Sequence, residues 1–113
     1  MKTILFFLLF CLIGCSSEEK PKPPKNLIEK DKMTLIMEEM LRLESYYQRT
    51  FGMPSIYKEP LKLAGENVFK KYGVSAKSYE DSYRYYAQQF DVFLEMNQTI
   101  IERQNKNLLD LSK

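Results

Sequence analysis

The stretch that decides the fold is DKMTLIMEEMLRLESYYQRT, residues 31–50. Its apolar side chains recur at spacings of three and four residues, which is the period of one face of an α-helix. Asp31 or Lys30 precedes this periodic run, and aspartate is a favourable N-cap. The helix is expected to end by Thr50, before Gly52 and Pro54. The predicted apolar face contains Met33, Ile36, Met37, Met40, Leu43 and Tyr47.

A second helix is expected after a loop with apolar content over residues 51–58. Pro60 suits the first turn of this helix, because the N–H that proline lacks has no partner there. Gly73 follows the helix as a residue that adopts the left-handed conformation at little cost. The predicted inner face of this helix contains Leu61, Ala64, Val68 and Tyr72.

Two more helices are expected downstream. Either Ser75 caps the third helix, or Ser78 caps it with Asp81 three residues later. The chain should break near Asp91, and the fourth helix should cover residues 92–109. The predicted inner faces contain Tyr79, Ser82, Tyr83 and Tyr86 in the third helix, and Phe93, Met96, Ile100, Gln104, Leu108 and Leu111 along the fourth.

These elements predict an all-α domain, a small bundle of about four helices over residues 27–113. No stretch alternates in the manner of a strand, and helix-favouring residues such as Leu, Met, Glu and Lys are common. With fewer than 100 residues in the domain the core is small. We therefore expect nearly all apolar faces to be used in packing.

The beginning of the chain has the pattern of a lipoprotein signal peptide over residues 1–14. Lys2 supplies the positive charge, and residues 4–13 form an uninterrupted apolar run. This run is shorter than the roughly 20 apolar residues that a membrane-spanning helix needs. It leads into Leu12-Ile13-Gly14-Cys15, which resembles the bacterial lipobox. Cleavage is expected between Gly14 and Cys15, and lipidation on the thiol of Cys15.

Residues 15–26 are predicted to be the lipidated cysteine and a disordered, flexible tether. The segment SSEEKPKPPKN, residues 16–26, contains three prolines and no hydrophobic residue, which is typical of an extended charged spacer. A diacylglyceryl group on Cys15, with palmitate or another acyl chain on the new amino terminus, anchors a protein stably. The predicted location is the cell envelope outside the cytoplasm, with the outer membrane favoured.

Composition excludes several classes of function. The chain has no histidine, and both cysteines fall within the first 15 residues, so Ser-His and Cys-His catalysis is excluded. We expect no enzyme, no cofactor and no metal site. Removal of Lys2 with the signal leaves 17 − 1 = 16 basic against 15 acidic residues, which argues against nucleic acid as a partner.

Several motifs resemble a known family. They are Phe69–Ser75 (FKKYGVS), Tyr79–Ser82 (YEDS) and the Tyr85-Tyr86 pair. Together they resemble the Bacteroidetes lipoproteins that carry the domain of unknown function 4296, over residues 26–111. The resemblance implies a lipobox, a proline-rich tether and a helical domain, with no assigned activity. In that phylum, acidic residues soon after the lipidated cysteine can direct lipoproteins to the cell surface. Ser17-Glu18-Glu19 is similar to such a signal, and an ordinary solvated tether is the open alternative.

The tyrosines are the remaining candidates for a binding site. Tyrosine combines a large contact area with a polar end, which suits interfaces. Tyr46 and Tyr85 lie off the main apolar stripes and are the candidate partner-binding residues. Core positions are predicted for Tyr47, Tyr72, Tyr79, Tyr83 and Tyr86. The leading hypothesis is a non-catalytic module that binds another envelope protein, and the alternative is an envelope chaperone or assembly factor for extended polypeptide.

Overall fold

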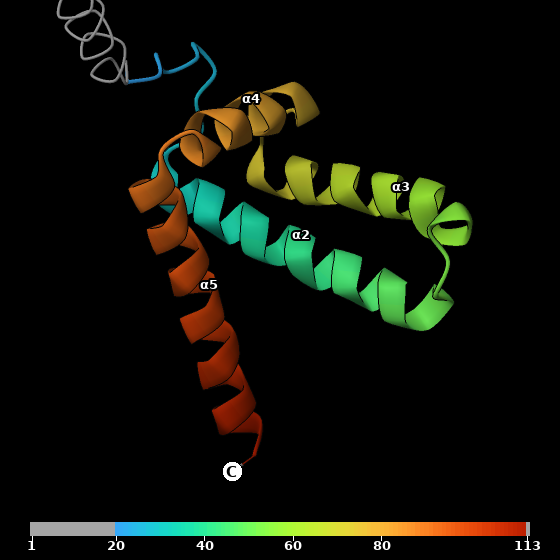
Figure 1. The fold of residues 1–113 in the computed structure, drawn as a ribbon. Coiled ribbons are helices and arrows are strands. Elements are labelled where there is room, and N and C mark those ends of the chain that lie inside the picture. Colours follow the sequence, from blue (N-terminus) through green and yellow to red (C-terminus); the bar gives the residue numbers. More distant parts are fainter. Residues whose placement is uncertain (1–19, 113) are drawn as a thin grey trace, which may run out of the picture.

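The computed structural model describes residues 20–112, which fold into four helices and contain no strand (Figure 1). They are α2 (Lys30–Phe51), α3 (Pro54–Tyr72), α4 (Ala76–Ala87) and α5 (Phe90–Leu111). The predicted all-α bundle is confirmed. The predicted signal peptide, its cleavage site at Gly14 and Cys15, and the first part of the tether lie outside the described residues.

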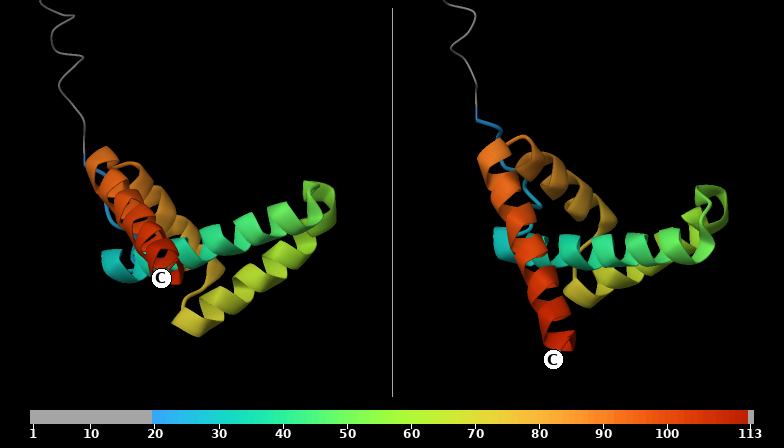
Figure 2. Two further views of the ribbon diagram at one scale, coloured as in Figure 1. Left: turned by 90° about the horizontal axis from the view of Figure 1, so that it is seen from below. Right: turned by 60° about the horizontal axis from the view of Figure 1, so that its bottom comes forward.

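Helices α2 and α3 form an antiparallel hairpin, and α4 lies across the end of this hairpin at which α2 begins and α3 ends (Figures 1 and 2). Helix α5 starts at the same end and crosses α2 steeply, as both views of Figure 2 show. The two helices then diverge, so that the carboxyl end of α5 points away from the rest of the bundle. The molecule therefore has one compact end and one open end.

The first helix starts slightly earlier than its sequence suggested. Glu29 is the N-cap, and its carboxylate accepts hydrogen bonds from the backbone N–H groups of Asp31 and Lys32. The expected cap at Asp31 or Lys30 is therefore wrong by one or two residues. Helix α2 ends at Phe51, and Gly52 follows with a φ of 74°, donating its N–H to the carbonyl of Gln48.

The predicted loop over residues 51–58 is wrong, because α3 begins at Pro54. Pro54 occupies the first-turn position that the sequence had suggested for Pro60, and Pro60 lies inside the helix. Both prolines suit the first turn of a helix. The helix begins at Pro54, which is closer to Gly52 at the end of α2. Pro60 is exposed, so water can hydrate the carbonyl that its missing N–H leaves unbonded.

The turn between α3 and α4 agrees with the sequence. Gly73 adopts the left-handed conformation, with φ 67° and ψ 32°, and its N–H bonds back to the carbonyl of Lys70. Of the two possible caps for α4, the structure selects Ser75, whose Oγ accepts a hydrogen bond of 3.0 Å from the N–H of Ser78. Helix α4 ends at Ala87 and α5 begins at Phe90, close to the expected break at Asp91.

The hydrophobic core lies at the compact end, where α2, α4 and α5 meet. Its buried apolar side chains come from positions that share one face of each helix. These side chains are Met33, Ile36 and Met37 in α2, Tyr86 in α4, and Met96 and Ile100 in α5, together with Ile28 from the segment before α2.

A short segment before α2 is held in place by α4. The N–H of Ile28 donates to the buried Oγ of Ser82 at 2.9 Å, and the hydroxyl of Tyr86 donates to the carbonyl of Ile28 at 2.6 Å. We call this arrangement the Ile28 clamp. Asn26 is also bound, because its carbonyl accepts from Ser78 Oγ at 2.6 Å. The ordered domain therefore begins before Leu27, within the last residues of the predicted tether.

The expectation that nearly all apolar faces are used in packing is wrong. The last turns of α5 expose Leu108 (65%), Leu109 (64%) and Leu111 (83%), and no other described helix covers them. Tyr83, which was predicted to be a core residue, is 41% exposed on α4. The exposure of the leucines follows from the shape of the bundle, since a bundle that opens at one end leaves an amphipathic helix face without a neighbour there.

Candidate interaction groove between α2 and α5

Two ion pairs mark the part of α2 and α5 where the helices lie side by side. Lys30 Nζ lies 2.8 Å from Glu95 Oε1 at the start of both helices, and Arg103 Nη1 lies 3.2 Å from Glu38 Oε2 two turns later. Each pair joins residues 65 positions apart, and together the pairs hold the first part of α2 against the first part of α5. Beyond Glu38 the two helices separate.

Among residues 20–112, Glu38 is the last residue along α2 whose side chain makes an ion pair or hydrogen bond with α5. Its carboxylate is only 6% exposed and accepts hydrogen bonds from Arg42 at 2.7 Å and from Arg103 at 3.2 Å. A carboxylate removed from water is stabilised when its oxygens receive such charge-assisted bonds. One negative and two positive groups leave this cluster with a net charge of +1.

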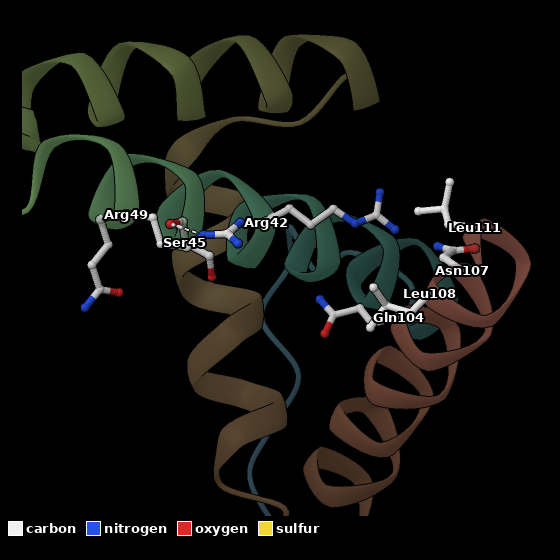
Figure 3. Close-up of a pocket in the computed structure, with 8 residues that line it drawn as sticks. Arg42, Ser45, Arg49, Gln104, Asn107, Leu108 and Leu111 are labelled. Atoms are coloured by element: carbon white, nitrogen blue, oxygen red, sulfur yellow. Dashed lines mark hydrogen bonds between the residues drawn. The ribbon is translucent and has the colours of Figure 1, made fainter.

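A groove of about 610 Å³ opens between the helices beyond this cluster (Figure 3). The α5 residues that line the groove share one face of the helix and include Leu108 and Leu111. The α2 wall is polar, and Figure 3 shows the Arg42 side chain reaching from α2 toward the α5 wall. The lining is Arg42, Ser45, Gln48 and Arg49 from α2, and Gln104, Asn107, Leu108 and Leu111 from α5.

A neighbouring hollow of about 500 Å³ shares Arg42 and Asn107 with the groove and is bordered by a second polar cluster. Glu39 Oε1 accepts from Lys71 Nζ at 2.6 Å and from the Tyr72 hydroxyl at 2.7 Å. These hydrogen bonds, first from Lys71 and then from Tyr72, lower the pKa of Glu39. The bond to Glu39 also raises the pKa of Tyr72. The cluster holds α3 against α2.

A smaller apolar pocket of about 200 Å³ lies between α2, α3, α4 and α5, lined by Met37, Met40, Leu41, Glu44, Leu61, Tyr79, Tyr83 and Asn97. Burial raises the pKa of Tyr79 to about 12, so its phenol remains neutral in the physiological range. The Tyr79 ring also packs against the rings of Phe69 and Tyr83, so this residue joins α3 to α4.

The two tyrosines predicted as partner-binding residues lie on different helices, and neither lines the groove. Tyr46 is 56% exposed on α2, with its ring 5.6 Å from that of Tyr47 in an edge arrangement. Tyr85 is half-buried and packs against the core. Tyr46 therefore has the exposure that partner binding needs, whereas Tyr85 has much less. Gly14 and Cys15 lie outside the described residues.

Sequence reasoning missed the groove residues Arg42, Arg49, Leu108 and Leu111 as a functional set. A signal for them exists in the sequence. The apolar stripe of α5 continues to Leu111, whereas the groove-lining positions of α2 become polar at Ser45, Gln48 and Arg49. Among residues 20–112, the last part of the α5 apolar stripe therefore has no complementary apolar surface on α2.

The described residues contain no set of three or more acidic side chains close enough to hold a metal ion. Within the same residues, no helix is both long and apolar enough to cross a membrane. The groove offers guanidinium groups, amides and leucines, which bind through charge, hydrogen bonds and apolar contact.

A match to a family model shows which protein family the chain belongs to. A family model described as "Domain of unknown function (DUF4296)" matches residues 24–108. The chain belongs to the DUF4296 family. The match begins at Pro24, immediately before the residues bound by α4, and reaches Leu108 in the groove wall. The match thus includes the segment that the Ile28 clamp holds, helices α2, α3 and α4, and α5 as far as Leu108. No curated protein and no solved structure matches the chain.

Proposed function

We propose that this DUF4296 protein is a bacterial lipoprotein whose helical domain is a non-catalytic protein-interaction module of the cell envelope. The observation that carries the proposal is the groove between α2 and α5, with its exposed leucines. Soluble monomers rarely expose contiguous apolar patches without a binding role. Here Leu108 and Leu111 stand next to arginines, and arginine is enriched at protein interfaces.

The direction of the groove supports the proposal. The described chain before α2, from Lys20 onward, leaves the domain beside α4, whereas the carboxyl end of α5 lies at the opposite end of the molecule (Figure 1). A lipid on Cys15 would therefore hold the compact end toward the membrane. The groove would face away from the membrane, where it is accessible to another protein.

The interaction is tested by site-specific photo-crosslinking in intact cells. A photoreactive amino acid at Leu111, in the groove, should give a discrete adduct with a protein. The same amino acid at Lys77, exposed on α4 away from the groove, serves as the matched control. Equal labelling from both positions would contradict a specific interaction site. Adducts of many different masses at Leu111 would favour a chaperone for extended polypeptide instead.

The anchor is tested separately by mass spectrometry of the mature amino terminus. The lipobox Leu12-Ile13-Gly14-Cys15 supports an acylated Cys15 as the first residue. Cys15→Ala should leave the precursor uncut and should remove the protein from the membrane fraction. A mature chain that retains Leu12 would overturn the assignment. Protease treatment of intact cells, compared with isolated outer membranes, tests the proposed outer-membrane location and its exposure at the surface.

A further inference from the structure

The groove between α2 and α5 has two unlike walls. On α5, Leu108 and Leu111 face the groove and are mostly exposed. On α2, the lining side chains are hydrophilic, and the two arginines among them are seven positions apart. Seven positions are two helical turns, or about 10 Å along the helix axis. An occupant of the groove must therefore offer an apolar side to α5 and a polar side to α2.

The charge of the groove lining is positive. Among residues 20–112, the lining includes Arg42 and Arg49 and no acidic side chain. Glu44 lies between these arginines along α2, but it lines the smaller apolar pocket instead. Asp110 lines the neighbouring hollow, where the three acidic side chains are balanced by three basic ones. The excess of positive charge is therefore in the groove itself, and the polar side of its occupant is expected to be acidic.

Both arginines have hydrogen-bond donors left for such an occupant. Arg49 belongs to no ion pair among residues 20–112, and its Nε donates to the carbonyl of Ser45 at 3.3 Å. Arg42 donates through one Nη to Glu38 at 2.7 Å, and its side chain remains half-exposed. A guanidinium group carries five N–H donors in a planar fork that matches a carboxylate. Each arginine can therefore bind a carboxylate of a partner.

The shape of the groove favours a helix as its occupant. The lining comes from α2 and α5 alone, which diverge toward the open end (Figures 1 and 3). A small-molecule site encloses most of its ligand, which a groove with two walls does not do. Along both walls the backbone N–H and C=O groups are bonded within their own helices, so an extended segment would find no backbone partner there. An amphipathic helix bonds its own backbone and has one apolar and one polar side.

We propose that the groove binds an acidic amphipathic helix of another protein. The apolar side of this helix packs against Leu108 and Leu111, and acidic side chains two turns apart on its other side pair with Arg42 and Arg49. Binding of a helix in a groove is a recurring mode of peptide recognition. A second copy of this chain fits less well, because residues 103–111 at the end of its α5 include two basic residues and one acidic residue. The inference rests on the proposed function, since it states the chemistry of the partner of the same groove.

Photo-crosslinking with synthetic peptides tests this chemistry on the full-length chain in isolated membranes. The chain carries a photoreactive amino acid at Leu111. One peptide is an amphipathic helix with leucines on one side and glutamates two turns apart on the other, and its matched control has glutamine in place of every glutamate. The glutamate peptide should label the chain at least about fivefold more strongly, as expected for two partly exposed arginine–carboxylate pairs. Equal labelling by both peptides, or no labelling by either, would overturn the acidic partner.

Removal of one arginine tests the assigned contact. Arg49→Gln should reduce the preference for the glutamate peptide to about twofold, because one of the two pairs is lost. Lys62→Gln removes the same charge at an exposed position of α3 outside the groove, and it should leave the preference unchanged. Both positions are exposed, so folding should be unchanged, as far-UV circular dichroism will show. An undiminished preference in Arg49→Gln would overturn the pairing.

The photo-crosslink at Leu111 in intact cells separates this inference from the proposed function. Digestion of the adduct and mass spectrometry locate the crosslinked segment of the partner. A segment with acidic and apolar residues at helical spacing supports the inference. A discrete adduct with a basic or uncharged segment, or with a second copy of the chain, overturns the acidic helix and leaves the interaction module in place. Labelling from Leu111 that does not exceed labelling from Lys77 would overturn the proposed function itself.

Discussion

The two ends of the α2/α5 pair are built from the same two helices, yet they differ sharply in burial. At the compact end, Met33, Ile36, Met96 and Ile100 are fully buried. At the open end, Leu108 and Leu111 continue the same α5 face and are mostly exposed. The difference lies in the third element, because α4 and the clamped Ile28 segment fill the angle between the helices only at the compact end. Stability is therefore concentrated at one end, and surface available for binding at the other.

The largest expected effect comes from truncating matched aliphatic side chains at the two ends. Ile36→Ala should lower the free energy of unfolding by about 2–5 kcal/mol, because it removes buried surface and leaves a cavity. Leu111→Ala should change the free energy of unfolding by less than about 0.5 kcal/mol. Urea denaturation followed by circular dichroism measures both. Similar losses for the two variants would contradict the division of the molecule into a stabilising end and an open end.

The next effect concerns the Ile28 clamp. Ser82→Ala leaves the buried N–H of Ile28 without its acceptor and should cost about 1–3 kcal/mol of stability. Ser78→Ala is the matched control, because its hydroxyl also bonds the preceding segment, but at an exposed position where water can replace it. The control should cost clearly less. If both variants lose the same stability, burial at the clamp is not what makes the Ser82 bond important.

A smaller effect is expected where the two ends meet, at Glu38. Glu38→Gln removes the charge between two guanidinium groups. Loss of one partner from a fully buried pair costs about 3–5 kcal/mol. The arginine side chains here are 52% and 40% exposed, so solvent screening reduces the expected cost to about 1–2 kcal/mol. Glu95→Gln, at the exposed pair with Lys30, should cost between 0 and about 1 kcal/mol.

The smallest effect is a pH dependence at Glu39. The pKa of this carboxyl is lowered from its usual 4.5 by Lys71 and Tyr72. Its contribution to stability is therefore fully present above pH 4.5 and is lost as the pH falls through the lower pKa of the folded state. Tyr72→Phe removes one of the two hydrogen bonds and should raise the pKa of Glu39. An NMR titration of the Glu39 side-chain carboxyl measures this shift, and an unchanged value would contradict the assigned cause.

Local signals in the sequence predicted much of the fold, since they depend on neighbours along the chain. Gly73 and Ser75 act in the turn as their residue types indicate. The predicted start of α3 was wrong because Pro54 and Pro60 each suit the first turn of a helix. It also failed for Tyr83, whose exposure depends on how far α4 lies from the other helices. Ser82 was expected on an inner face, but its bond to Ile28, 54 residues away, has no signal in local spacing.

The sequence by itself determined that the described chain is helical, which face of each helix is apolar, where the turns fall approximately, and which chemistries the residue types exclude. These properties follow from the 3.6-residue period and from residue-specific backbone preferences, which act over a few positions. Only the tertiary structure decided which part of each apolar face is covered. Coverage depends on the angle at which α2 and α5 separate. That angle is set by packing among Ile28, α4 and the core, between residues far apart along the chain.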